Sequence, residues 1–117
     1  MKMRVLSFLL VFALAFGLVS SVSAQNYSFT LERETVDVYV NADGTLTVQY
    51  AFTFVNAAGA SPIDFVDVGL PNSGYEYSSI EADVNGQPVS ISSDYQGSGS
   101  YGVAVELGSR AIRAGDR

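Results

Sequence analysis

Cysteine and histidine are absent from this 117-residue chain, and its only lysine is Lys2. Without cysteine, no disulfide can reinforce a small exported domain, so its stability must come from packing. Nucleophilic triads built on histidine or cysteine are excluded, as are the usual zinc and copper sites. Lysine-based covalent chemistry is excluded beyond the N-terminal segment. Only carboxylate and hydroxyl chemistry remains, and we expect no cofactor.

The N-terminal segment has the features of a secretory signal. Lys2 and Arg4 precede an apolar run over residues 5–19, and small residues follow as far as Ala24. This pattern predicts a signal peptide over residues 1–24 that is cleaved after Ala24. The alternative is an uncleaved anchor, because about 20 apolar helical residues span a bilayer. We expect a protein that is secreted or lies on the extracellular face of the cell envelope.

Residues 25–117 are enough for one small domain and too few for two. They retain four arginines against all twelve acidic residues, which gives a net charge of −8. An acidic surface repels phosphate backbones, so nucleic acid is not expected as a partner. The stretch SRAIRAGDR ends on a turn-like sequence where another strand would begin. We therefore expect a domain truncated at its C-terminal end, with membrane contact only through the signal segment or through regions beyond Arg117.

Short alternating or apolar runs, bounded by turn-forming residues, recur along the chain after residue 24. A spacing of about 8 to 12 residues between such runs is typical of an all-β sandwich or barrel. We predict an antiparallel β-sandwich, Ig-like, of about seven strands. The predicted strands cover residues 27–33, 35–41, 45–55, 62–69, 77–84, 87–92 and 101–107.

The stretch VNADGTLTVQY predicts a hairpin. A three-residue loop over residues 42–44 places Asn41 opposite Thr45 and thereby fixes the pairing along both strands. A loop one residue longer would pair residues from opposite faces of the hairpin. Gly44 then takes the left-handed position beside a bulge. The predicted register pairs apolar residues: Val40 with Leu46, Val38 with Val48, and Val36 with Tyr50.

The stretch EADVNGQPVSIS predicts a second hairpin. Asn85 and Gly86 are a strong signal for a two-residue turn. Pro88 cannot donate a hydrogen bond to a neighbouring strand, which indicates an outer strand of the sheet. The predicted register pairs Ile80 with Ile91 and Ala82 with Val89.

Asn41, Asp43 and Gly44 superficially resemble the middle of a calcium loop. The spacing of an EF-hand would place Tyr39 and Tyr50 at ligand positions that require carboxylates, so we expect plain turn chemistry and no metal. A looser calcium site shared with Asp37 or with a distant loop is the alternative.

Asp64 and Asp67 could be the paired acids of a glycosidase. Residues three apart in an extended strand point to opposite faces, so the two carboxylates would not share a pocket. We therefore predict no catalytic residue and no enzymatic activity, and treat the acidic residues as solvent-facing charges.

Four tyrosines lie near glycine- and serine-rich connections: Tyr75, Tyr77, Tyr95 and Tyr101. Aromatic side chains on such loops suit adaptable recognition and the stacking of sugars. Packing of the rings into the core, with the hydroxyls reaching solvent, is the alternative. These tyrosines are our candidate ligand-binding residues.

The stretch VDVYVNADGTLTVQYAFTF, residues 36–54, resembles the start of the extracellular N-terminal domain in a family of bacterial predicted membrane proteins of unknown function. In that family a D-G turn between paired strands precedes a long alternating strand. The resemblance implies a surface β-sandwich anchored by later transmembrane segments.

Two functions follow as hypotheses. The first is a non-catalytic exported or cell-surface β-sandwich module with a structural or interaction role, whose partner is an unknown protein or glycan at the cell surface. The second is a carbohydrate-binding or other ligand-binding module that uses the tyrosine-bearing loops. Fold alone does not choose between them.

Overall fold

The computed structural model describes residues 25–117, so the predicted signal peptide lies outside the described residues. The described chain is mostly β-strand, with two short 3₁₀ helices. No helix in this part of the chain is long and apolar enough to cross a membrane. The elements are β1 (Phe29–Val40), β2 (Leu46–Asn56), β3 (Phe65–Gly69), η1 (Tyr77–Ser79), β4 (Ala82–Val84), β5 (Gln87–Ser92), β6 (Gly102–Glu106) and η2 (Gly108–Arg110).

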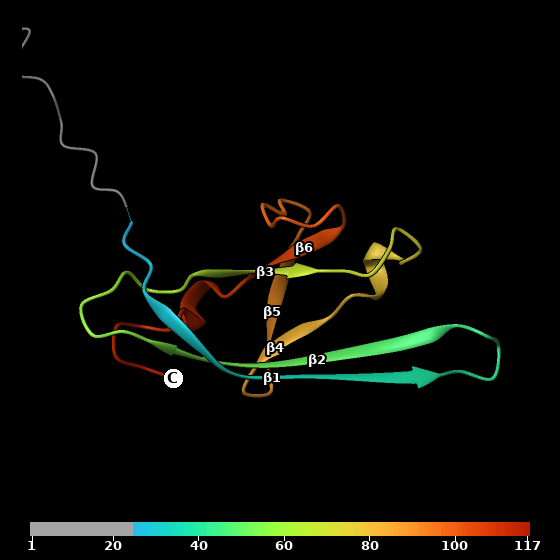
Figure 1. The fold of residues 1–117 in the computed structure, drawn as a ribbon, viewed down its shortest axis with the longest axis horizontal. Helices are drawn as coiled ribbons and strands as arrows, with labels where there is room; N and C mark the ends of the chain where they lie inside the picture. The colour runs from blue at the N-terminus through green and yellow to red at the C-terminus, as the bar shows by residue number, and fades with distance from the viewer. Residues whose placement is uncertain (1–24) are drawn as a thin grey trace, which may run out of the picture.

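The strands form two antiparallel sheets. β1 and β2 make a long two-stranded hairpin, and the other sheet has the strand order β3-β6-β5-β4. Figure 1 shows the hairpin running along one side of the four-stranded sheet, with its turn reaching past the rest of the described chain. The prediction of an all-β antiparallel fold is confirmed, with six strands in the described residues in place of about seven.

The strand count differs because β1 is one strand where we predicted two. The polar run Glu32-Arg33-Glu34 interrupts the apolar alternation and suggested a break near Glu34. In the structure Leu31 pairs with Phe54 and Arg33 pairs with Thr53, which leaves Glu32 as an extra residue. Such a bulge shifts the alternation by one position without ending the strand.

The predicted register of the first hairpin is confirmed at all three apolar pairs. The Asn41 N–H donates to the Thr45 carbonyl at 2.9 Å, and the Gly44 N–H donates to the Asn41 carbonyl at 3.0 Å. Gly44 has a φ of 85°. This left-handed backbone favours glycine, so the local turn chemistry sets the register of the whole hairpin.

The second hairpin is confirmed in part. Asn85 and Gly86 both have positive φ, at 52° and 79°, as the predicted two-residue turn requires. Ala82 pairs with Val89 as predicted. The predicted pair of Ile80 with Ile91 is wrong, because residues 77–79 form η1 and β4 begins only at Ala82.

The prediction that Pro88 marks an outer strand is also wrong, because β5 lies between β4 and β6. Pro88 is opposite Asp83 in β4, whereas the pairing of β5 with β6 begins only at Ser90. In an antiparallel hairpin the backbone groups of alternate residues point away from the partner strand. Pro88 lies one pair beyond the turn, so its missing N–H faces the side where β6 has already ended.

Buried residues lie at the end of β2, in the segment between β2 and β3, and in β6 with the residue that follows it. Asn56 is 1% exposed and Val103 is 2% exposed. The Asn56 side-chain amide donates to the carbonyls of Ser61 and Ile112, each at 3.0 Å. The apolar residues of the core are Ala60, Ile63, Val103, Ala104 and Leu107.

The β1–β2 hairpin has two parts that differ in burial. We call residues 29–35 with 51–56 the base half and residues 36–50 the turn half. The base half contains half-buried Phe52 and Phe54 and ends at buried Asn56. In the turn half, exposure increases along β1 from 45% at Val36 to 79% at Val40.

Candidate functional site

The four candidate tyrosines lie on two connections of the four-stranded sheet, between β3 and β4 and between β5 and β6. Tyr75 lies in the segment between β3 and η1, Tyr77 is the first residue of η1, and Tyr95 and Tyr101 lie between β5 and β6. Tyr75, Tyr77 and Tyr101 are 37%, 44% and 43% exposed. Tyr95 is half-buried. The aromatic contacts found in the described residues include no pair among these four rings.

Tyr95 lies against glycines of its own loop. The Gly99 N–H donates to the Tyr95 hydroxyl at 3.1 Å. A Cβ atom built on Gly97 or on Gly102 would overlap the Tyr95 side chain. A side chain at either position would require the Tyr95 ring to move. The glycine-rich sequence therefore holds the Tyr95 ring within the loop.

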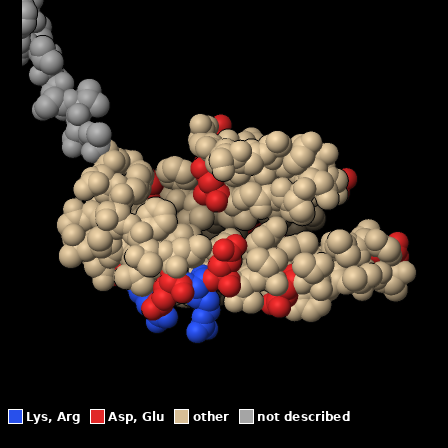
Figure 2. Space-filling view, in the orientation of Figure 1, with Lys and Arg blue, Asp and Glu red and all other residues tan. Residues whose placement is uncertain are grey.

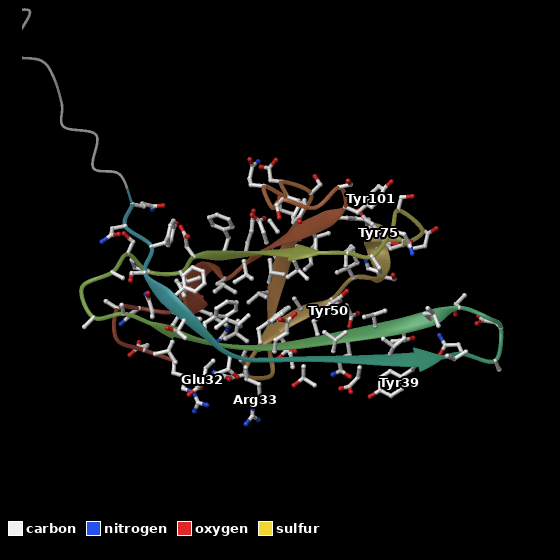
Figure 3. All side chains as sticks on the ribbon, viewed as in Figure 1. Glu32, Arg33, Tyr39, Tyr50, Tyr75 and Tyr101 are labelled. Atoms are coloured by element: carbon white, nitrogen blue, oxygen red, sulfur yellow. The ribbon has the colours of Figure 1, made fainter. Side chains whose placement is uncertain are left out.

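The other three tyrosines differ in whether their hydroxyl forms a hydrogen bond within the protein. The Tyr77 hydroxyl donates to the Ile91 carbonyl at 2.9 Å, which ties η1 to β5. Within the described residues, Tyr75 and Tyr101 form no side-chain hydrogen bond. Figure 3 shows both at the same end of the four-stranded sheet, where the Leu70 N–H donates to the Tyr101 carbonyl at 2.9 Å. Tyr75 and Tyr101 are thus the two candidates whose polar ends are free to meet a ligand.

The Asp43 carboxylate is used inside the turn. Its Oδ1 accepts hydrogen bonds from the Thr45 hydroxyl at 2.7 Å and from the Thr45 N–H at 3.0 Å. Both hydrogen bonds hold the pKa of Asp43 below its usual value, and the bond from the hydroxyl has the larger effect. This arrangement is the turn chemistry expected from the sequence. Within residues 25–117, no group of three or more acidic side chains is placed to hold a metal ion.

Asp64 and Asp67 are held by different partners. Asp64 accepts a hydrogen bond from the Tyr27 hydroxyl at 2.9 Å, whereas Asp67 accepts one from the Gln96 N–H at 3.2 Å. The bond to the Asp64 carboxylate raises the pKa of Tyr27, because it stabilises the protonated phenol. Each carboxylate thus fixes a neighbouring segment of chain.

The turn half of the hairpin presents an apolar surface that our sequence reasoning did not identify. Figure 3 shows Tyr50 pointing toward the four-stranded sheet, and every second pair from Val36–Tyr50 toward the turn shares its face. On this face Val38 is 56% exposed and Leu46 is 59% exposed. The available signal was strand length, because the predicted strand over residues 45–55 is longer than those over residues 62–69 and 101–107. Short strands cannot cover a long hairpin.

Charged side chains border the hairpin on its other face. Figure 2 shows the basic residues of this view gathered beside acidic ones along one margin of the molecule. Arg117 and Glu32 form an ion pair there. Figure 3 shows Glu32, Arg33 and Tyr39 pointing away from the four-stranded sheet. The hairpin therefore has an inner face that is apolar apart from Glu34, which lies opposite Phe52, and an outer face that carries Glu32 and Arg33.

Comparison with protein-family models, with curated proteins and with solved structures finds no match to this chain.

Proposed function

We propose that this chain is a non-catalytic, exported or cell-surface β-sandwich module with a structural or interaction role. The observation that carries the proposal is the turn half of the β1–β2 hairpin, whose inner face leaves Val40 79% exposed. Exposed apolar patches of soluble proteins commonly mark interaction sites. On the resemblance of residues 36–54 alone, we also propose that this domain is related to the extracellular N-terminal domains of bacterial predicted membrane proteins of unknown function.

An Ig-like sandwich is the architecture that these sheets suit best. The inner face of β2 carries Tyr50, Phe52 and Phe54, whose neighbouring ring centroids are each 6.0 Å apart. The Phe29 ring meets that of Phe54 edge-on at 5.7 Å. A row of aromatic residues suits the interior of two sheets packed face to face at about 10 Å. The proposal assigns the hairpin to one layer and the four-stranded sheet to the other.

Export is tested by the mass of the mature protein. Expressed with its own N-terminal segment in a secreting host, the chain is expected outside the cytoplasm with a mass that begins at Gln25. Replacing Ala24 with a bulky residue should block the cleavage, because small residues are required at the cut site. Recovery of the full-length chain in the cytoplasm would contradict export.

The interaction role is tested by crosslinking from the exposed apolar face. A photoreactive residue at Leu46, displayed at the native cell surface, is expected to give a discrete crosslinked species. A matched residue at exposed Ser109, in η2, is the control. Equal, diffuse crosslinking from both positions would mean that the turn half has no preferred partner.

The alternative function is ligand binding, and one observation favours it. Tyr75 and Tyr101 are exposed at the same end of the four-stranded sheet, and neither hydroxyl is bound within the described residues. A glycan array is the direct test, followed by titration of any hit with Tyr75→Ala and Tyr101→Ala. Tyr39→Ala is the control, because Tyr39 is 52% exposed on the outer face of the hairpin. No binding, or equal loss in all three variants, would remove this alternative.

A further inference from the structure

The outer edge of β1 is open along its whole length. β1 pairs with β2 on one side, and within the described residues no strand pairs with its other side. All twelve residues of β1 are exposed. An open edge offers unpaired N–H and C=O groups to any further strand. The open edge of β1 is therefore a surface that can bind a partner through the backbone.

The first hairpin shows which backbone groups of β1 point outward. The bond from the Asn41 N–H to the Thr45 carbonyl marks a hydrogen-bonded pair next to the loop. Hydrogen-bonded and non-hydrogen-bonded pairs alternate along an antiparallel ladder. Counting back from Asn41, the backbone groups of Glu34 and Val36 point away from β2. An added strand would find its donors and acceptors at these two residues.

Two opposite charges flank the middle of this edge. Arg33 and Asp37 lie two residues on either side of Thr35, so they share the outer face. Neither forms an ion pair or a side-chain hydrogen bond within the described residues, where Arg117 with Glu32 is the ion pair observed. The edge thus presents one positive and one negative charge, symmetrically placed.

We propose that β1 pairs antiparallel with β1 of a second copy of this chain, about a two-fold axis at Thr35. Arg33 of each copy then lies opposite Asp37 of the other, which makes two ion pairs by symmetry. Both are non-hydrogen-bonded pairs in the new ladder, where Cα atoms approach to about 4.5 Å and side chains interact most closely. The proposal specifies the partner for the interaction role proposed above and rests on it.

Charge selects this register over its neighbours. An axis at Glu34 places two glutamates opposite each other, and an axis at Asp37 places two aspartates opposite each other. Like charges directly opposite are destabilising. An axis at Val36 makes no ion pair at all, because Arg33 then meets Tyr39. An axis at Thr35 is the one in the middle of β1 that places Arg33 and Asp37 of each copy opposite a side chain of opposite charge.

The same pairing continues the inner face of the hairpin from one copy into the other. Val36 and Val38 are 45% and 56% exposed on the open side of the hairpin. In the proposed dimer Val36 lies opposite Glu34 of the second copy on this face, and the two hairpins form one continuous four-stranded layer. The interface is isologous, so it closes after two copies and leaves no β1 edge for further growth.

Charge reversal tests the proposal. Full chains, expressed with their own N-terminal segment, are compared by sedimentation at equal concentration and low salt. Arg33→Asp and Asp37→Arg each place like charges opposite one another in a homodimer, and each is expected to weaken association on the order of tenfold. Mixing the two variants pairs opposite charges again at both positions. The mixture, and the double variant alone, should therefore recover the dimer.

Arg113→Asp and Asp94→Arg are the matched controls, since both residues are exposed and lie outside β1. They should leave association unchanged, and circular dichroism should show that every variant folds. A monomeric wild-type chain would overturn the proposal, as would a dimer indifferent to Arg33 and Asp37, or a mixture that stays monomeric. A monomer that still gives a discrete crosslink from Leu46 to another protein would overturn the dimer alone. Loss of that crosslink would count against the interaction role itself.

Discussion

The two halves of the β1–β2 hairpin carry the same apolar alternation along β2, yet the base half ends in the core and the turn half ends in solvent. At its end Asn56 is 1% exposed, whereas Val40 in the turn half is 79% exposed. Alternation therefore reports which face of a hairpin is apolar, and the number and length of the other strands decide how much of that face is covered. Chemically similar substitutions in the two halves should therefore differ in their effect on stability, because the apolar alternation is the same but the burial is not.

The largest difference is expected between two asparagines. Asn56→Ala removes the donor for the carbonyls of Ser61 and Ile112 inside the core. Loss of two buried hydrogen bonds should lower the free energy of unfolding by about 2 to 3 kcal/mol. Asn41→Ala removes exposed bonds to Thr45 and Thr47 and should cost less than about 1 kcal/mol. Urea denaturation measures both, and equal costs would contradict the distinction between the halves.

A second contrast concerns apolar side chains on the inner face. Phe54→Ala should cost about 2 kcal/mol, below the range for fully buried phenylalanine because Phe54 is only half-buried. Leu46→Ala, at 59% exposure, should change the unfolding free energy by less than about 0.5 kcal/mol. Thermal unfolding of monomeric protein at low concentration is the measurement. A large cost for Leu46→Ala would show that the turn half is covered in solution.

The turn itself should be sensitive to backbone strain alone. Gly44 has a φ of 85°, and a Cβ built there meets nothing within 4 Å. Gly44→Val should therefore cost about 1 to 2 kcal/mol purely from the left-handed backbone. Gln49→Val places the same side chain at an extended position of the same hairpin and should cost nothing measurable. Comparable costs for the two would argue against the left-handed turn.

The smallest effect should appear at low pH. The folded turn lowers the pKa of Asp43, so its stabilising contribution is present above the usual value of 3.8 and disappears as the pH falls through the lower folded value. Asp43→Asn keeps an acceptor oxygen but does not titrate there. The difference in melting temperature between wild type and Asp43→Asn should therefore shrink on acidification. A difference that is independent of pH would mean that the carboxylate charge plays no part in the turn.

The features that the sequence predicted correctly depend on short-range chemistry. The register of the first hairpin follows from Gly44 and the three-residue loop, and that of the second follows from Asn85 and Gly86. Residues within a few positions of each turn determine its conformation, so a single sequence contains the information. The all-β class follows in the same way from alternation between turns.

The features that were missed depend on contacts between distant segments. The polar run around Glu34 looks like a strand end, because only the partner strand shows that the pairing continues past the bulge at Glu32. Ile80 has the alternation of a strand residue, yet η1 places it outside the ladder. Among the candidate site residues, exposure of the tyrosines could not be deduced, because the glycine neighbours that enclose Tyr95 act through three-dimensional packing.

The bulge gives β1 an unusual tolerance to deletion. Losing one residue from a paired strand normally turns every side chain beyond it to the opposite face. Glu32 has no partner in β2, and its two neighbours are already opposite consecutive residues, Phe54 and Thr53. A chain that lacks Glu32 could therefore keep every apolar pair and lose only the ion pair with Arg117. Related chains that are one residue shorter at this position would adopt the same hairpin with a straighter first strand.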